Sequence, residues 1–140
     1  NAELQFQVNS TDDAGGSYNA SPMTTTIFGA YHNEDDLSVG IGYFDGHDIA
    51  NAATFQNLTY NQEVNTDSSM SGSMTLYAPS STTYVKHFIA RTNGMGGWGA
   101  SLDNFIAGYI NDYQYAIDEI KFQSSSGDID AGTIYMYGVS

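Results

Sequence analysis

Apolar and polar residues alternate in short segments along the whole chain, and turn-forming residues separate these segments. The clearest example is residues 37–43, where Leu37, Val39, Ile41 and Tyr43 alternate with serine and glycine. A period of two places successive side chains on opposite faces of a β-strand. We therefore expect residues 37–43 to form an amphipathic strand that buries its apolar face.

The same pattern predicts eight or nine short strands, which in sequence order cover residues 4–8, 23–31, 37–43, 54–60, 74–76, 84–92, 105–110, 115–123 and 133–139. Val85, Phe88 and Ile89 are the expected apolar anchors of one of them, and the glycine-rich residues 92–101 are expected to form a loop. Each strand must bury one face, which favours an all-β fold, a single antiparallel β-sandwich that is jelly-roll-like. This domain is expected to span residues 1–140, with an N-terminal arm and loop as the alternative for residues 1–22.

Composition supports the same fold class. The many aromatic residues, the 15 glycines and only 2 prolines are typical of short strands and tight turns. Charged residues make up 14% of the chain, well below the roughly 25% of average domains, so helices with Glu- and Lys-rich surfaces are not expected. No apolar run approaches the ~20 residues of a membrane-spanning helix.

The chain is strongly acidic, with 16 acidic and 3 basic side chains and a formal net charge of -13. Because Lys86, Arg91 and Lys121 are the only strong cations, we expect neither nucleic acid nor membrane as a partner. Partners should instead be neutral, basic or bridged by cations. The chain has no cysteine, which excludes disulfides, thiolate nucleophiles and cysteine-based metal sites.

Residues 115–139 form the most distinctive part of the sequence. An isoleucine-rich segment precedes a Ser-Ser-Ser-Gly-Asp loop, and a second alternating segment follows it. We expect residues 115–123 and 133–139 to pair as a hairpin. Ile134 and Met136 would then pack beside the apolar side chains of the first strand, since a slip of one residue would expose them.

The ending Gly-Thr-Ile-Tyr-Met-Tyr-Gly-Val at residues 132–139 resembles that of small bacteriophage head-fibre and capsid decoration proteins. Those proteins often close with an isoleucine-rich strand, a Ser/Gly/Asn loop and a strand that finishes in Leu-Tyr-Gly-Ile or a similar sequence. The glycine-rich residues 93–98 are similar to a loop that they place two strands upstream. The resemblance implies a β-sandwich that caps or decorates a virion and that gathers as a trimer, and it implies no chemistry.

No arrangement of residues suited to catalysis, to a cofactor or to a metal ion is evident, so none of these sites is predicted. His32, His47 and His87 are scattered and lack the spacing of known histidine metal motifs. The acidic turns offer the oxygen ligands that calcium prefers, but they lack EF-hand spacing, and calcium binding stays open. These turns are at residues 12–13, 34–36, 45–48 and 128–130.

Aromatic residues are the candidate binding groups: Trp98, Tyr109, Tyr113 and Tyr115. One interpretation is that they lie at an interface between subunits, where tyrosine and tryptophan are enriched. The other is that they form a sugar-stacking platform. A row of exposed rings would favour glycan binding, and burial between chains would favour assembly.

These observations predict a non-enzymatic structural protein on the exterior of a virion capsid. It would decorate or cement the capsid, or build a head fibre, by binding the capsid protein and by associating with itself as a homotrimer. The alternative is a carbohydrate- or receptor-binding β-sandwich module.

Overall fold

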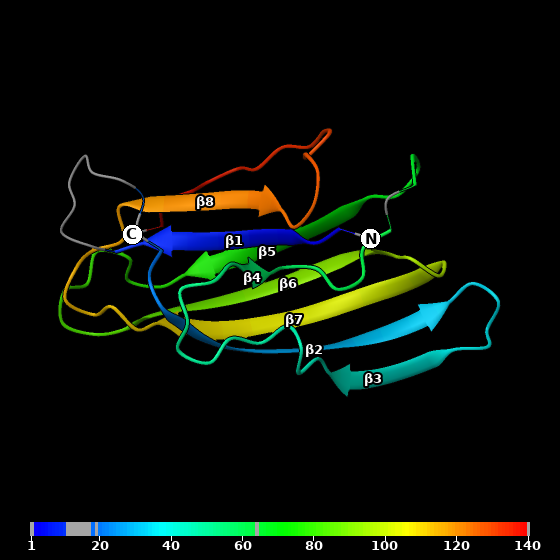
Figure 1. Ribbon diagram of the computed structural model, residues 1–140, viewed down its shortest axis with the longest axis horizontal. Helices are drawn as coiled ribbons and strands as arrows, with labels where there is room; N and C mark the ends of the chain where they lie inside the picture. The colour runs from blue at the N-terminus through cyan, green and yellow to red at the C-terminus, as the bar shows by residue number, and fades with distance from the viewer. Residues whose placement is uncertain (1, 11–17, 19, 64, 140) are drawn as a thin grey trace.

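The structure is a computed structural model that describes residues 2–10, 18, 20–63 and 65–139 (Figure 1). These residues contain eight strands and no helix, which confirms the predicted all-β class. The strands are β1 (Leu4–Asn9), β2 (Met23–Asn33), β3 (Val39–Tyr43), β4 (Gln56–Asn57), β5 (Met70–Leu76), β6 (Lys86–Gly96), β7 (Ala100–Ile110) and β8 (Glu119–Ser124).

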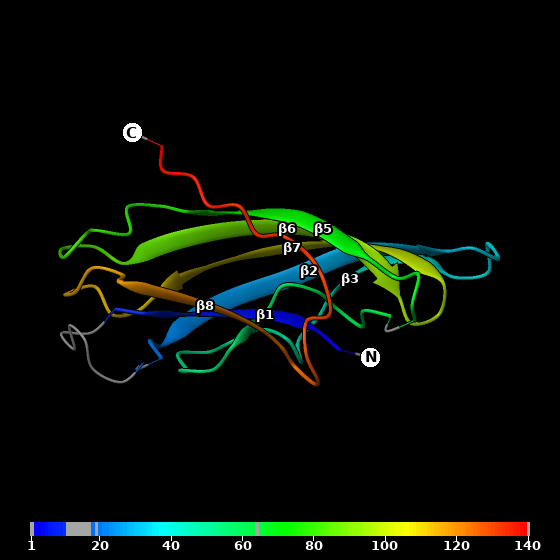
Figure 2. The same ribbon diagram turned by 90° about the horizontal axis from the view of Figure 1, so that it is seen from above.

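The strands form two antiparallel sheets that pack as a β-sandwich, as predicted. The small sheet has the order β4-β1-β8 and the large sheet has the order β3-β2-β7-β6-β5. Figure 2 shows the small sheet on one side and the large sheet on the other. Strands from the two ends of the chain pair with each other, β1 with β8 and β2 with β7, as they do in a jelly roll, whereas β6 pairs with its sequence neighbours. Because β1 is the central strand of the small sheet, residues 4–9 are not an N-terminal arm.

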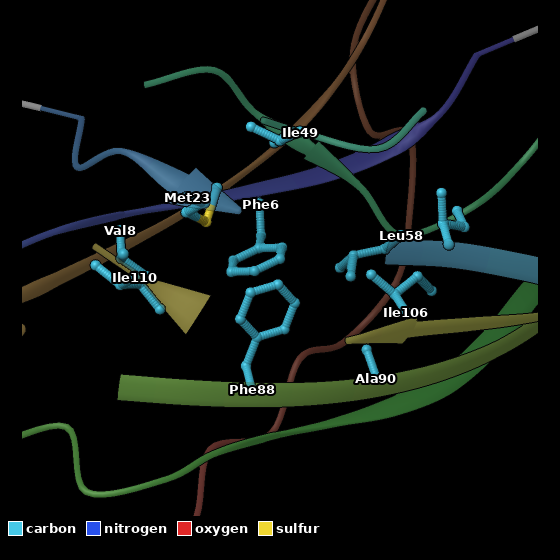
Figure 3. Close-up of a cluster of buried hydrophobic side chains, with 10 residues drawn as sticks. Phe6, Val8, Met23, Ile49, Leu58, Phe88, Ala90, Ile106 and Ile110 are labelled. Carbon is cyan, nitrogen blue, oxygen red and sulfur yellow. The ribbon is translucent and has the colours of Figure 1, made fainter. Parts of the chain in front are cut away.

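Apolar side chains from both sheets meet in one core between them (Figure 3). At its centre, the rings of Phe6 on β1 and Phe88 on β6 meet edge to face, with their centroids 4.8 Å apart. Since Phe88 points inward, its neighbour Ile89 points outward and is exposed, so its predicted role as an anchor is wrong. The buried core residues are Phe6, Val8, Met23, Ile27, Ile49, Leu58, Phe88, Ala90, Ile106 and Ile110.

The glycine-rich segment that was predicted as a loop is mostly strand. β6 continues to Gly96 and β7 begins at Ala100, so the turn between them takes only residues 97–99. Glycine is suited to this part of the strand because Gly96 faces the interior and leaves room there for a larger side chain. A Cβ atom on Gly96 would lie 2.6 Å from a methyl carbon of Leu102. The glycine therefore permits close packing within a strand here.

The predicted C-terminal hairpin is not formed. β8 pairs instead with β1, from Leu4 opposite Ser124 to Asn9 opposite Glu119. Residues 125–139 contain no strand, and Ile134 and Met136 are exposed. Figure 2 shows this segment leaving the side of the small sheet and crossing to the far side of the large sheet. The prediction that Ile134 and Met136 pack on the apolar side chains of residues 115–123 was therefore wrong.

Candidate functional site

The four aromatic residues predicted as a binding site do not form a single platform. Trp98 lies in the turn between β6 and β7, whereas Tyr109 is near the opposite end of β7. At about 3.3 Å per residue, these two positions are on the order of 30 Å apart. Tyr113 and Tyr115 lie in the loop after β7, at the same end as Tyr109. The two groups of rings therefore cannot stack on the same sugar.

The rings at each end make separate contacts. Trp98 is 40% exposed and packs edge to face against Tyr31, with their centroids 6.1 Å apart. At the other end, the ring of Tyr109 lies 6.0 Å from that of His87. Tyr113 lines a shallow depression beside this pair, together with Thr83, Tyr84, Val85 and His87. Tyr115 is exposed in the same loop.

The largest unexpected feature is the apolar stripe of β3 and the turn before it. Leu37, Val39 and Ile41 are 84%, 71% and 76% exposed, and Tyr43 is also exposed. The prediction that this face of residues 37–43 is buried was therefore wrong. The stripe belongs to the outer face of the large sheet, which we define as the face turned away from the small sheet.

Pairing with β2 explains why Gly40 of β3 points inward. Gly40 lies opposite Tyr31, and a Cβ atom at Gly40 would be 2.8 Å from the Tyr31 hydroxyl oxygen. Similarly, a Cβ atom at Gly29 would be 2.9 Å from the ring of Phe44. Large aromatic side chains from neighbouring segments thus fill the space above these positions. At Gly40 only glycine leaves that space open, so the larger side chains on either side of it in β3, Val39 and Ile41, face outward.

An aromatic row continues from this stripe across the outer face. Tyr43, Phe28, Phe105 and Arg91 are successive cross-strand neighbours on β3, β2, β7 and β6. The rings of Phe28 and Phe105 are stacked, with centroids 5.1 Å apart and an interplanar angle of 6°. The Arg91 guanidinium lies 4.8 Å from the Phe105 centroid. Since β2 and β6 flank β7, the ring of Phe105 is covered from both sides.

A bidentate ion pair ends the row. Arg91 donates from Nε to Asp103 at 3.0 Å and from a terminal nitrogen to its second carboxylate oxygen at 2.6 Å. These hydrogen bonds lower the pKa of Asp103 and raise the pKa of Arg91. Beside them, Ser71, Gly72 and Asn93 complete the lining of a shallow polar depression. The pair thus places a neutralised charge next to the aromatic row.

Acidic residues border the apolar stripe at both ends of β3. Asp36 lies in the turn before β3, where its carboxylate is 2.7 Å from Nε2 of His32. In the turn after β3, Asp48 accepts a hydrogen bond of 2.6 Å from the hydroxyl of Tyr43, which raises the pKa of this tyrosine. Exposed acidic residues flank the stripe: Glu34, Asp35, Asp36, Asp45 and Asp48. An apolar centre with a polar rim is the usual anatomy of a protein-binding surface.

The histidines and acidic turns do not converge on a metal site in the part of the chain that the structure describes. Nowhere in it do three or more His, Cys, Asp or Glu side chains gather in a group that could hold a metal ion. His47 approaches the Asn57 amide at 2.6 Å and packs against Tyr60. Asp12 and Asp13, which were considered as calcium ligands, lie outside the described residues.

No protein-family model, no curated protein and no solved structure matches this chain. Within the described residues there is also no helix of the length and hydropathy needed to cross a membrane. The outer face of the large sheet is therefore the candidate site on physical grounds alone.

Proposed function

We propose that this protein is a non-enzymatic binding subunit that docks the outer face of its large sheet onto another protein. The observation that carries the proposal is the exposed apolar stripe of β3, which continues into the row of Tyr43, Phe28 and Phe105. Soluble monomers rarely expose large contiguous apolar patches, and such patches mark interaction sites. The free energy of exposed aliphatic side chains falls most when a contact with another apolar protein surface removes them from water.

Charge defines the chemistry of the partner. The stripe lies between acidic turns on a chain with a net charge of -13, so an apolar surface with a basic rim complements it best. Contacts at the centre of the stripe would be uncharged, and binding should therefore persist as the salt concentration rises.

The sequence resemblance suggests a virion as the setting for this contact. We accordingly propose the capsid protein as the partner, with this protein as a decoration, cement or head-fibre subunit on the capsid exterior. The proposed contact requires no cofactor, catalytic residue or metal ion.

Co-sedimentation of the recombinant protein with purified capsids that lack it tests this proposal. Wild type should pellet with the capsids, and Ile41→Ser should weaken binding by at least about tenfold, which is about 1.4 kcal/mol. Ile129→Ser is the matched control, because Ile129 is also exposed but lies outside the large sheet. Equal binding of Ile41→Ser and wild type would show that the stripe is not the contact.

Glycan or receptor binding is the second candidate, and the polar depression around Asn93 and Asp103 favours it. A sugar would find hydrogen-bonding groups there, beside an aromatic side chain. However, Phe28 and Arg91 cover both sides of the Phe105 ring, which leaves no open ring face on which a sugar could stack. Binding on a glycan array that Asn93→Ala abolishes and Ile41→Ser preserves would favour this candidate over docking on a protein.

A further inference from the structure

Residues 132–139 have the sequence of a strand but pair with no other strand in the described parts of the chain. Apolar and aromatic side chains alternate along them, and none of these residues is charged. Their large side chains are exposed, from 59% for Ile134 to 97% for Val139. A segment with this composition gains stability when its backbone and its apolar face are covered.

We propose that residues 132–139 of one copy add as an edge strand to β8 of a second copy. β8 is an edge strand of the small sheet, with β1 on one side and no strand on its other side among the described residues. Its backbone can therefore accept another strand by β-augmentation. This contact is separate from the outer face of the large sheet, so it does not depend on capsid binding.

The apolar sides of the two segments match. On β8, the half-buried Ile120 and Phe122 pack against the core between the sheets. On the added strand, Ile134 and Met136 are two residues apart and thus share one face. If these two side chains face the large sheet, they would extend the apolar layer between the sheets beyond β8. The alternate residues, Tyr135 and Tyr137, would then lie on the outside, beside the exposed Glu119 and Lys121 of β8.

Two observations favour a second copy over the chain's own β8. Residues 125–131 would form a seven-residue connection, whereas hairpin loops usually have two to five residues. Fully extended, such a connection reaches about 23 Å, enough to bring the segment to a neighbouring molecule. Within its own chain, the segment crosses instead to the far side of the large sheet (Figure 2).

Electrostatics permits this contact despite the charge on each copy. Two chains of charge -13 repel each other at long range. The donated segment is uncharged, and β8 carries Lys121, one of only 3 basic residues in the chain. Since each copy donates a strand and receives one, the contact is head to tail and can close into a ring.

Sedimentation velocity of full-length variants tests the self-association. We expect wild type to be a closed oligomer in the micromolar range, and Met136→Asp to sediment as a monomer with an unchanged circular dichroism spectrum. Ser126→Asp makes the same change in charge within the connection and should remain an oligomer. Monomeric wild type, or an oligomer that persists in Met136→Asp, would overturn the proposal.

Disulfide trapping identifies the acceptor strand, because the chain has no cysteine of its own. In two separate double variants, Lys121→Cys is combined with Tyr135→Cys or with Tyr137→Cys. Directly opposed strand residues have Cα atoms close enough for a disulfide.

In at least one double variant, mild oxidation should give covalent dimers and larger species on a non-reducing gel. Ser80→Cys with Tyr137→Cys, a pair that joins the segment to the exposed loop between β5 and β6, should give none. A disulfide within single chains would show that the segment folds onto its own β8. That result, or no disulfide in either double variant, would contradict the proposal.

Discussion

Isoleucines on the two faces of the large sheet should differ sharply in what they contribute to stability. Ile106 on β7 is 1% exposed and packs in the core (Figure 3), whereas Ile41 on β3 is 76% exposed. Both are strand residues, so the substitutions Ile106→Ala and Ile41→Ala remove the same atoms from similar backbones. Burial is the main physical difference between the two positions.

The expected magnitudes follow from that difference. Ile106→Ala should lower the free energy of unfolding by about 2–5 kcal/mol, because it loses transfer free energy and leaves a cavity. Full burial of an isoleucine contributes roughly 1.5–3 kcal/mol to the free energy of unfolding. Only about a quarter of the Ile41 side chain is buried. Ile41→Ala should therefore cost about 0.4–0.8 kcal/mol, with up to about 1 kcal/mol more from lower strand propensity.

Urea denaturation, followed by circular dichroism, measures both changes. With a slope of roughly 1–3 kcal/mol per molar urea, Ile106→Ala should shift the midpoint by about 1 M or more, and Ile41→Ala by much less. The measurement is made at two protein concentrations, because any association through the stripe would stabilise wild type by mass action. Equal losses for the two variants in monomeric protein would refute the outward orientation of the β3 stripe.

Three further predictions concern packing, a buried charge and metal ions. Gly29→Ala should cost about 1–3 kcal/mol in urea denaturation, because its Cβ would lie 2.7 Å from the backbone oxygen of Asp103, while Gly42→Ala has open space and should be nearly neutral. Burial lowers the pKa of Lys86 below 10.5, against the opposing effect of Asp112. As the pH approaches 10.5, the unfolded chain therefore binds more protons than the folded protein. The free energy of unfolding of wild type should then rise relative to that of Lys86→Met over this pH range. A difference between the two proteins that stays constant with pH would contradict this. EDTA should leave the melting temperature unchanged, and a large decrease would indicate a calcium site in the acidic turns.

The alternating pattern was sufficient to predict the sandwich but not the direction in which each strand faces. In residues 37–43, a period of two correctly predicts that leucine, valine and isoleucine share one face. That face points outward because Tyr31 and Phe44 occupy the inner positions above Gly40 and Gly29. These contacts join segments that are distant along the chain or on different strands, and local alternation carries no information about them.

The sequence also did not predict which strand pairs with β8 near the C-terminal end. β8 was predicted near its observed position, but its strand partner is β1, more than 100 residues earlier, and residues 133–139 do not pair with it. Adjacent segments often pair, which made the hairpin the simplest expectation. The outcome shows that a strand-like pattern predicts the need for a partner without identifying it.

The candidate site was predicted only in part. Trp98, Tyr113 and Tyr115 are exposed as a binding site requires, but the length of β7 separates the tryptophan from the tyrosines. The row through Phe28 and Phe105 was missed, because the predicted strands that contain these phenylalanines were not assigned an inner and an outer face. One signal was present: in β2 and β7, large apolar residues occupy both faces, which indicates a sheet whose outer face is also suited to burial.

Solvent protection of the stripe on the capsid tests docking through the outer face most directly. Because the chain has no cysteine, Ile41→Cys places a single thiol in the stripe and Ile129→Cys places one outside the large sheet. We expect alkylation of the thiol at position 41 to be at least about tenfold slower on capsids than in free protein, and alkylation at position 129 to be unchanged. Equal alkylation of position 41 in free and capsid-bound protein would contradict docking through this face.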